Sequence, residues 1–304
     1  MEKNYKTVFI FMDTDKHASP FDILMAVDAL PETVVLKYEN VTVEDAEDLI
    51  YDIIFPRGPE GAKHTKIFIN GRNFDLANEI LEKIKGKMFP PFEVSVVIDP
   101  RGAYTTASAA VAKTLQFSLV KGLGSLENKT VTVLAGTGPV GRTAAMLYAS
   151  EKAKVVVTSR DLKKAEMVAG KVNETFKETR ACGFEAKTPE EVGEAIKESE
   201  IILATGAAGI QLLPLNVLKE YGKKCRIVAD INAVPPLGVE GMKPTADGKE
   251  IVPNVFGIGA LAIGKIKSYT EAEIIRKAAE EPKGIFDYKI AYQIAKESVL
   301  KTIS

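Results

Sequence analysis

The stretch that decides the fold is KTVTVLAGTGPVG, residues 129–141, followed at once by RTAAMLYASEKA. A β-branched run leads into a Gly-x-Gly-x-x-Gly turn, and a helical pattern follows the turn. In this order, Gly136 permits a tight turn, Gly138 lets a ligand approach the backbone, and Gly141 lets helix and strand pack closely. The segment predicts the first βα unit of a dinucleotide-binding domain, with the pyrophosphate at the helix amino terminus.

The end of the second predicted strand of this domain, VVVTSR, bears on the choice of cofactor. An NAD enzyme commonly carries a carboxylate there to bind the ribose 2′-hydroxyl, but this chain has Ser159 and Arg160. Because arginine can bind a phosphate bidentately and a carboxylate would repel it, NADP is favoured over NAD. A solvated basic helix start is the alternative, and it explains Lys163 and Lys164 better than Arg160.

Two later strand ends complete the predicted cofactor site. The small residues 205–207 leave room for a ligand, although close strand–helix packing explains them nearly as well. Asp230 and Asn232 precede Pro235-Pro236, a rigid turn in which a cis bond is a possibility. The full set of expected cofactor-binding residues is Gly136, Thr137, Gly138, Pro139, Val140, Gly141, Ser159, Arg160, Lys164, Thr205, Gly206, Ala207, Asp230 and Asn232.

The remaining pattern predicts a second α/β domain. The first hundred residues interleave short apolar runs with amphipathic helical patterns, which is typical of a parallel sheet. Residues 103–122 are predicted to form one Ala-rich helix. The fold class is therefore α/β, with a Rossmann-type NADP domain at residues 123–264 and a discontinuous substrate domain at residues 1–122 and 265–304. The active site is expected in the interdomain cleft.

Composition excludes several functional classes. A length of 304 residues fits two domains. The 40 basic and 41 acidic side chains leave a net charge of -1, so no general attraction to nucleic acid or to an anionic membrane is expected. The apolar runs are too short for a membrane span or a secretory signal.

Cysteine and histidine usage narrows the chemistry. Cys182 and Cys225 are far apart and lack metal-ligand spacing, which favours a cytoplasmic, reducing location. His17 and His64 are the only histidines and form neither a triad nor a metal motif. No metal is therefore expected.

Polar residues crowd the loop after the first predicted strand, where open α/β sheets bind ligands. Asp15, His17, Phe21 and Asp22 are the candidates there. Ser19, which is followed by proline, is explained at least as well as the N-cap of the next helix.

A second polar segment, DPRGAYTT at residues 99–106, lies where the last strand of the first domain turns into the long helix. Asp99, Thr105 and Thr106 are candidates for substrate contact. The alternative is that the two hydroxyl groups cap the helix.

Together these segments resemble the NAD(P)-dependent methylene-tetrahydromethanopterin dehydrogenases over essentially the whole chain. The shared stretches are SPFDILMAVDA, FPRGP, KIFINGRN, FPPFEVSVVIDPRGAYTTASA, VLAGTGPVG, ATGAAGIQLLP, ADINAVPPLGVEG and GIGALAIGKIK. The resemblance implies an oxidoreductase of one-carbon metabolism that transfers a hydride reversibly from methylene-tetrahydromethanopterin to NADP+, giving methenyl-tetrahydromethanopterin and NADPH. It also implies a homo-oligomer, with a trimer expected.

The resemblance further implies roles for individual residues. Phe21 and Asp22 contribute to the pterin pocket, and Lys267 matches a lysine of the GAL-containing loop at the active site. Asp22 and Lys267 are thus the expected catalytic residues. Two nitrogens flank and stabilise the methenyl cation, so hydride transfer requires no general acid or base and depends on orientation. A charged lysine beside that cation would be unfavourable, so Lys267 is expected either to move away when both ligands bind or to order the empty site.

Three alternatives stand beside this interpretation. The first is methylene-tetrahydrofolate as substrate, since the pterin heads are alike. The second is a non-catalytic NADP-binding sensor, although such a sensor would need neither residues 99–106 nor the Lys267 segment. The third is a shikimate- or quinate-type dehydrogenase, in which Asp99 and Lys16 would form the proton-transfer pair.

Overall fold

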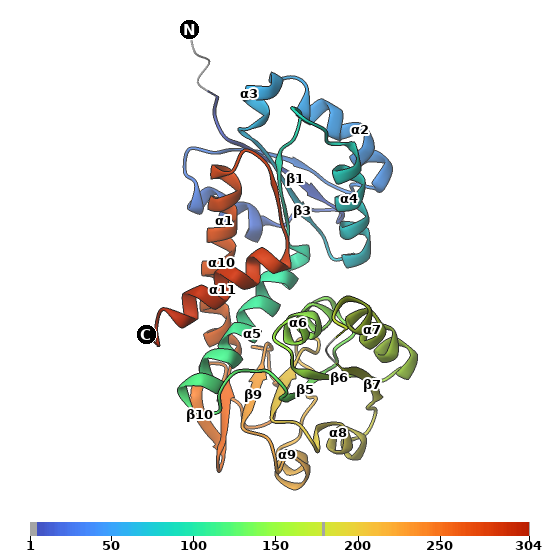
Figure 1. Cartoon of the computed structure of the whole chain (residues 1–304), viewed down its shortest axis with the longest axis vertical. Helices are drawn as coiled ribbons and strands as arrows, with labels where there is room; N and C mark the ends of the chain where they lie inside the picture. The colour runs from blue at the N-terminus through green and yellow to red at the C-terminus, as the bar shows by residue number, and fades with distance from the viewer. Residues whose placement is uncertain (1–4, 178–179, 304) are drawn as a thin grey trace. The chain divides into compact units, whose positions relative to one another are not determined.

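The computed structural model describes residues 5–177 and 180–303. The chain forms two compact units, coloured along the sequence in Figure 1, and each is described by itself. Unit 1 comprises Met1–Thr105 and Ser268–Ile294, and unit 2 comprises Thr106–Lys267 and Ala295–Ser304.

The division between the units falls inside three long helices. These are α5 (Ala103–Val120), α10 (Ala260–Glu280) and α11 (Tyr288–Leu300). The domain limits expected from the sequence, after residue 122 and before residue 265, both fall within unit 2 and so differ from these division points. The functional domain limits remain a prediction.

Unit 1 contains a five-stranded parallel sheet with the order β12-β4-β3-β1-β2. Its strands are β1 (Val8–Asp13), β2 (Val34–Tyr38), β3 (Thr65–Asn70), β4 (Ser95–Ile98) and β12 (Gly284–Phe286). Its own helices are α1 (Pro20–Ala29), α2 (Val43–Ile54), α3 (Gly58–Ala62), α4 (Phe74–Lys87) and the short 3₁₀ helix η1 (Pro100–Gly102).

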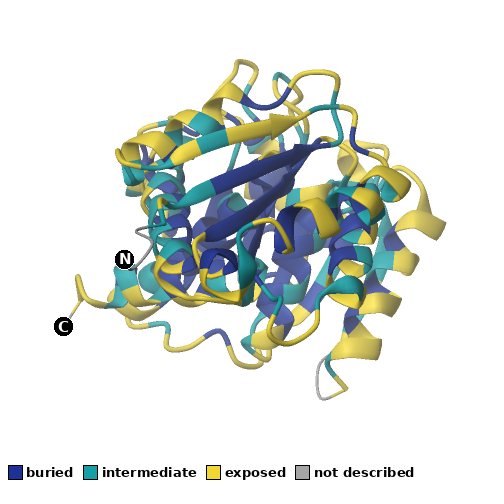
Figure 2. Ribbon diagram, turned by 90° about the horizontal axis from the view of Figure 1, so that it is seen from above, coloured by how far each residue is buried: buried dark blue, intermediate teal, exposed yellow. Residues whose placement is uncertain are grey.

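The two faces of this sheet are both buried, as a parallel sheet requires. Along β1, Phe9 and Phe11 belong to one apolar cluster, and Ile10 and Met12 belong to the other. Phe11 stacks on Phe68 of β3 with ring centroids 4.7 Å apart. In Figure 2 the inner strands are dark blue, whereas β2 at the edge is mostly exposed.

Unit 2 contains a seven-stranded sheet with the order β10-β11-β9-β8-β5-β6-β7, in which only β10 runs antiparallel to its neighbour. The strands are β5 (Thr130–Leu134), β6 (Lys154–Ser159), β7 (Ala181–Glu185), β8 (Ile201–Ala204), β9 (Ile227–Asp230), β10 (Asp247–Val252) and β11 (Val255–Ile258). The helices between them are α6 (Pro139–Ser150), α7 (Leu162–Thr175), α8 (Pro189–Ile196) and α9 (Leu215–Tyr221).

Each sheet reverses its strand order beside its first strand. In unit 1, β1 lies between β2 and β3, and in unit 2, β5 lies between β6 and β8. Ligands of open α/β sheets bind outside the carboxyl ends of the strands at such a switch point. The α/β fold class with a Rossmann-type unit is confirmed, and each unit has one edge where a ligand is expected.

Several elements differ from the sequence-based expectation. The sequence of residues 270–303 predicts helices broken at Pro282 and Gly284, and the structure has in addition β12 at this break, paired with β4. The stretch expected to run from strand into a loop near Lys267 instead ends β11 at Ile258 and begins α10 at Ala260. None of the described helices is long and apolar enough to cross a membrane.

Candidate active site

The glycine turn of unit 2 joins β5 to α6. A Cβ atom on Gly141 would lie 2.5 Å from Gly136 Cα, and one on Gly136 would lie 2.9 Å from the Val133 carbonyl oxygen, so both positions exclude a side chain. A Cβ atom on Gly138 would meet nothing within 4 Å. The first and third glycines therefore serve packing, and the middle one leaves an open approach to the helix.

The left-handed position of this turn is not at a glycine. Ala135 has φ 52°, whereas Gly136, which the sequence suggested for the tight turn, does not have positive φ. The backbone N–H of Ala135 donates to the Thr158 hydroxyl at 3.0 Å, which holds the turn against β6. Sequence reasoning missed Thr158 because its partner lies 23 residues away.

Gly138 is the N-cap of α6 and makes no side-chain cap hydrogen bond, and Pro139 follows it. The first backbone N–H groups of a helix lack helical partners and attract anions. The site therefore fits the pyrophosphate of a dinucleotide. Thr137 and Val140 are half-buried in the same turn.

The end of β6 carries the residues expected to select the cofactor. Arg160 and Lys164 are exposed, and the Ser159 hydroxyl accepts from the Asp161 backbone N–H at 3.1 Å. Asp161, which the sequence analysis did not consider, caps α7 by accepting from the Lys164 backbone N–H at 3.4 Å. Arg160 is therefore available to a ligand, while the neighbouring carboxylate is engaged in capping.

The end of β8 supports the turn from the other side. The Thr205 hydroxyl donates to the Leu134 carbonyl oxygen at 2.8 Å, so its side chain ties β8 to β5. Gly206 is half-buried, with the Leu212 side chain 2.8 Å from where its Cβ would lie, and Ala207 is exposed. Packing therefore accounts for Thr205 and Gly206, and only Ala207 presents a free methyl group.

Asp230 and Asn232 shape the loop after β9. The buried Asp230 carboxylate accepts from the backbone N–H groups of Asn232 at 2.9 Å and Val239 at 3.0 Å. The Asn232 amide donates to the carbonyl oxygen of Pro236, which follows a cis bond. Burial raises the pKa of Asp230, although the backbone amides oppose this. Both side chains thus act within the protein, and their contact with cofactor stays a prediction.

In unit 1, buried polar side chains meet at the carboxyl ends of β1 and β3. Asn70 donates through Nδ2 to Asp22 Oδ2 at 2.7 Å, and both residues are almost fully buried. Ser19 caps α1 by accepting from the Asp22 backbone N–H, as the alternative interpretation of Ser19 expected. Phe21 is 53% exposed and is thus accessible to a ligand.

Asp15 is held by two arginine residues. Its carboxylate accepts from Arg101 Nε at 2.9 Å and from the Arg72 backbone N–H at 3.1 Å. Burial alone would raise the pKa of Asp15, but these donors outweigh it and lower the pKa below its ordinary value. Arg101 also donates to the backbone oxygen of His17, whose side chain is exposed. Asp15 is thus a structural anchor for Arg101.

Asp99 and Thr105 begin the long helix α5. The Asp99 carboxylate accepts from the Tyr104 backbone N–H at 2.8 Å and from the Thr105 hydroxyl at 2.6 Å. The Asp99 carboxylate therefore caps α5, and the Thr105 hydroxyl donates to that carboxylate instead of accepting a backbone N–H. This cap also engages the carboxylate that was considered as a partner of Lys16. Thr106 is half-buried and falls in unit 2.

Lys267 lies in the helix α10 rather than in a loop, and it is half-buried. It falls at the last position of the first segment of unit 2, whereas Asp22 belongs to unit 1. The two expected catalytic residues therefore stand in different units, and their meeting in an interdomain cleft stays a prediction.

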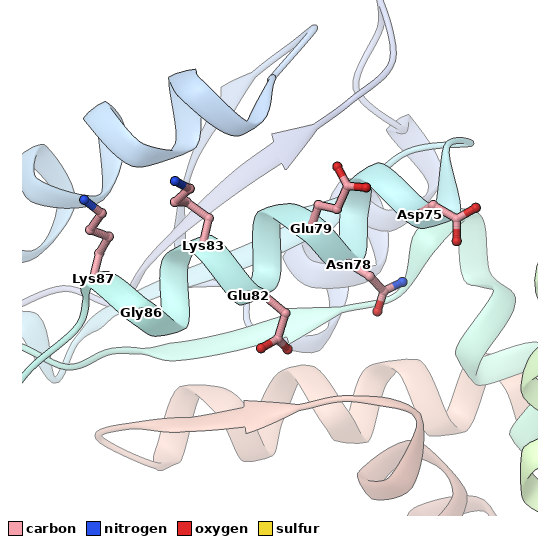
Figure 3. A pocket seen from close by; sticks show the side chains of 7 residues that line it. All are labelled: Asp75, Asn78, Glu79, Glu82, Lys83, Gly86 and Lys87. Atoms are coloured by element: carbon pink, nitrogen blue, oxygen red, sulfur yellow. The ribbon is translucent and has the colours of Figure 1, made fainter. Parts of the chain in front are cut away.

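Two surface hollows lie away from these residues. One, of about 740 Å³, lies along α4. Figure 3 shows that Lys83 and Lys87 of α4 point toward α2. Both lysines pair with Glu47, which lowers the pKa of that carboxyl to about 2. The other, of about 510 Å³, lies at the amino ends of β5 and β6. Neither is lined by a predicted site residue.

The two switch points and the glycine turn define the class of protein, a two-unit α/β protein with a Rossmann-type dinucleotide-binding unit. A family model described as the N-terminal part of methylene-tetrahydromethanopterin dehydrogenase matches residues 20–101. The chain is 34% identical over 292 residues to the NAD(P)-dependent methylenetetrahydromethanopterin dehydrogenase of Methylorubrum extorquens, covering 93% of this chain and 95% of that protein. The chain belongs to this dehydrogenase family.

Two further comparisons agree with this assignment. A second protein of Methylorubrum extorquens, named bifunctional protein MdtA, is 36% identical over 96% of this chain and 98% of its own length. A shikimate 5-dehydrogenase from Mycobacterium fortuitum has a similar fold, with a TM-score of 0.52, 13% identity and coverage of 97% of this chain and 99% of that chain. At that identity the structural likeness concerns the fold alone.

Proposed function

We propose that this chain oxidises methylene-tetrahydromethanopterin with NADP+, giving methenyl-tetrahydromethanopterin and NADPH in a reversible reaction. The observation that carries the proposal is 34% identity, over 93% of the chain, to an NAD(P)-dependent methylenetetrahydromethanopterin dehydrogenase. The open glycine turn of unit 2 supports it, because its backbone suits a dinucleotide phosphate.

NADP fits the residues of unit 2. Gly138 and the first turn of α6 would hold the pyrophosphate, and the exposed Arg160 would bind the 2′-phosphate with help from Ser159 and Lys164. Bound NADP+ supplies the acceptor for the hydride. NAD lacks the 2′-phosphate, so it would bind through fewer contacts and serve as a weaker cofactor.

The pterin half of the reaction would use the ligand edge of unit 1. Phe21 offers an exposed aromatic face for the flat pterin ring, and Asp22 offers a carboxylate to its N–H donors. The C–H bond of the one-carbon bridge breaks with both electrons leaving as hydride. The two nitrogens beside that carbon carry the positive charge, so the protein moves no proton and acts by orientation.

Lys267 is proposed to act on the empty site rather than on the reacting carbon. A charged ammonium group near the methenyl cation would raise the energy of the transition state. Lys267 would therefore either turn away when both ligands bind or order the site before they arrive. Turnover that is unchanged in Lys267→Ala would contradict both roles.

We also propose that the chain works as a homo-oligomer in the cytoplasm, with a trimer expected. Val34, Leu36 and Tyr38 on the edge strand β2 are exposed apolar side chains, which subunit contact would cover. Cys182 and Cys225 are both free thiols, which suits a reducing compartment. Light scattering of purified protein would give the mass of the assembly, and a monomer at all concentrations would contradict the oligomer.

Initial rates of NADPH formation test the proposed reaction. Purified protein would be assayed with methylene-tetrahydromethanopterin or methylene-tetrahydrofolate, each with NADP+ or NAD+. We expect the highest kcat/KM for the methanopterin substrate with NADP+. A higher kcat/KM for the folate substrate would reassign the carrier, and tight NADP binding without turnover on either pterin would favour the sensor.

A further inference from the structure

Asn70 is the last residue of β3, and its side chain is fully buried. Its Nδ2 donates to Asp22 Oδ2 at 2.7 Å, and its Oδ1 accepts from the backbone N–H groups of Gly71 and Arg101, both at 2.8 Å. A side-chain amide can donate to a carboxylate through its nitrogen while its oxygen accepts from two N–H groups. One side chain thus joins α1, the loop after β3 and η1.

The bond to Asn70 fixes one oxygen of Asp22 and leaves the other for a ligand. Asp22 Oδ1 accepts no hydrogen bond within the described part of the chain. It is also not one of the fully buried polar atoms without a hydrogen-bond partner. A pterin ring presents N–H donors at its 2-amino group and at the adjacent ring nitrogen. A carboxylate oxygen held in one orientation is the matching acceptor.

The same amide holds Arg101 in an uncommon backbone conformation. Arg101 has φ 49° and ψ 40°, a left-handed position that favours glycine. Its backbone N–H is held by Asn70, and its guanidinium is held by Asp15. Such backbone strain persists where the surrounding contacts over-determine it, and it concentrates at functional sites.

We propose that Asn70 is the positioning residue of the pterin site: it orients the Asp22 carboxylate toward the N–H donors of the pterin ring and fixes the Arg101 loop beside it. This inference rests on the proposed function of the unit 1 edge. Asn70 itself is enclosed by protein and touches no substrate, so its effect on binding passes through Asp22 and Arg101.

Asn70→Ser and Asn70→Asp test the role. Serine is too short to reach Asp22, and an ionised aspartate would repel it. We expect the KM for methylene-tetrahydromethanopterin to rise about tenfold to hundredfold, the usual range for losing a hydrogen bond to a charged group. The kcat should change much less, because the lost contact serves binding in ground and transition state alike. The Kd for NADP should stay within about twofold, since Asn70 and its partners belong to unit 1 and share no hydrogen bond with the cofactor residues of unit 2.

Asn78→Ser is the matched control. Asn78 is also an asparagine of unit 1 with both amide groups used, donating to the Phe74 carbonyl and accepting from the Tyr104 hydroxyl. Asn78 makes no hydrogen bond to Asp22 or Arg101. Asn78→Ser should lower thermal stability as Asn70→Ser does, yet leave the pterin KM near the wild-type value.

A pH series separates positioning from a merely structural role. In Asn70→Asp, protonation of the introduced carboxyl group at low pH restores a donor toward Asp22. The pterin KM of this variant should therefore fall toward the wild-type value as the pH is lowered, while Asn70→Ser shows no such recovery. The absence of recovery in a folded Asn70→Asp variant would contradict the positioning role.

Binding of the methenyl product, followed by its own absorbance, gives a readout independent of turnover. Folded Asn70→Ser with a pterin affinity equal to that of the wild type, or with equal losses for pterin and NADP, would overturn the inference. Wild-type protein that binds pterin more tightly than Asn70→Ser but does not reduce NADP+ would refute the proposed reaction and retain the positioning role. Wild-type protein that binds no pterin would refute both.

Discussion

In each unit a ligand is expected at the carboxyl ends of the strands, beside the first strand of the sheet. These two ligand edges occupy equivalent places, but one is built from backbone atoms and the other from side chains. In unit 2 the edge is a backbone surface, with Gly138 open to solvent and Gly141 packed on Gly136. In unit 1 the edge is made of side chains, with Asn70 and Asp22 at its centre. A phosphate needs N–H groups that one short segment can supply, whereas a pterin ring needs donors and acceptors from several segments.

Both edges also contain a buried aspartate that ends a strand and accepts backbone N–H groups of the following loop. Asp13 ends β1 and accepts from the backbone N–H two residues later, and Asp230 ends β9 and does the same. Each carboxylate accepts a second backbone N–H further along the loop, from Ser19 and from Val239. These buried aspartates shape the loops that follow the two strands.

The strongest test of the backbone-built edge is a pair of glycine variants. In Gly141→Ala the new methyl group would meet the backbone of Gly136, so we expect a loss of about 1–3 kcal/mol of stability or failure to fold. In Gly138→Ala the methyl group meets no protein atom, so stability should hold while NADP affinity falls about tenfold or more. Denaturant unfolding and NADP titration measure both effects.

The two glycine variants carry their own control, because the substitution is the same and only the surroundings differ. Equal stability of Gly141→Ala and the wild type would show that the turn relaxes, and would remove the packing role from Gly141. Unchanged NADP affinity in Gly138→Ala would show that the phosphate does not approach this residue.

This contrast explains how much the sequence could predict. The turn at residues 136–141, the strand–turn–helix unit around it and the start of α5 follow from local patterns of glycine, β-branched and capping residues. The helix cap at Ser19 could also be anticipated, because Ser19 lies three residues from the Asp22 backbone N–H that it accepts.

The side-chain network could not be predicted in this way. Asn70 lies 48 residues from Asp22 and 31 from Arg101, and Asp15 lies 86 residues from Arg101. Asp15 was therefore expected to bind substrate, whereas its carboxylate is engaged with arginine. The segment KIFINGRN resembled the family, but nothing in its pattern distinguished Asn70 from a turn residue.

Arg160→Asp tests whether cofactor choice belongs to the backbone-built edge. The change removes a charge-assisted contact and adds a carboxylate that repels the 2′-phosphate, so NADP affinity should fall about hundredfold. NAD affinity should change little, since NAD has only hydroxyl groups there. Titration with both nucleotides is the measurement, and an equal loss for NAD and NADP would refute the 2′-phosphate assignment. Lys163→Asp, at an exposed position in the first turn of α7, is the matched control.

Phe21→Ala addresses the side-chain-built edge. Loss of the exposed aromatic ring should raise the pterin KM about tenfold. This is the effect expected when a stacking contact and the apolar area that it buries are both removed. The NADP Kd should remain at the wild-type value, because the cofactor residues lie in unit 2. Leu24→Ala, at a second exposed apolar position of α1, serves as the control. An unaffected pterin KM in Phe21→Ala would remove this residue from the pocket.

The last comparison concerns the pH dependence of stability, which should have opposite signs at Asp15 and Asp230. Burial opposes ionisation of Asp15, but Arg72 and Arg101 lower its pKa, so its contribution is present above the ordinary pKa of aspartate and is lost as pH falls through the lowered value. Burial raises the pKa of Asp230, so its contribution is complete below the ordinary pKa and declines as pH rises through the raised value. Asp15→Asn should therefore cost about 1.5–3 kcal/mol near neutral pH and less in acid, whereas the cost of Asp230→Asn should be greater in acid. Urea unfolding of each variant across the acid range measures the difference, and parallel curves for the two variants would show that the carboxylates do not differ in this way.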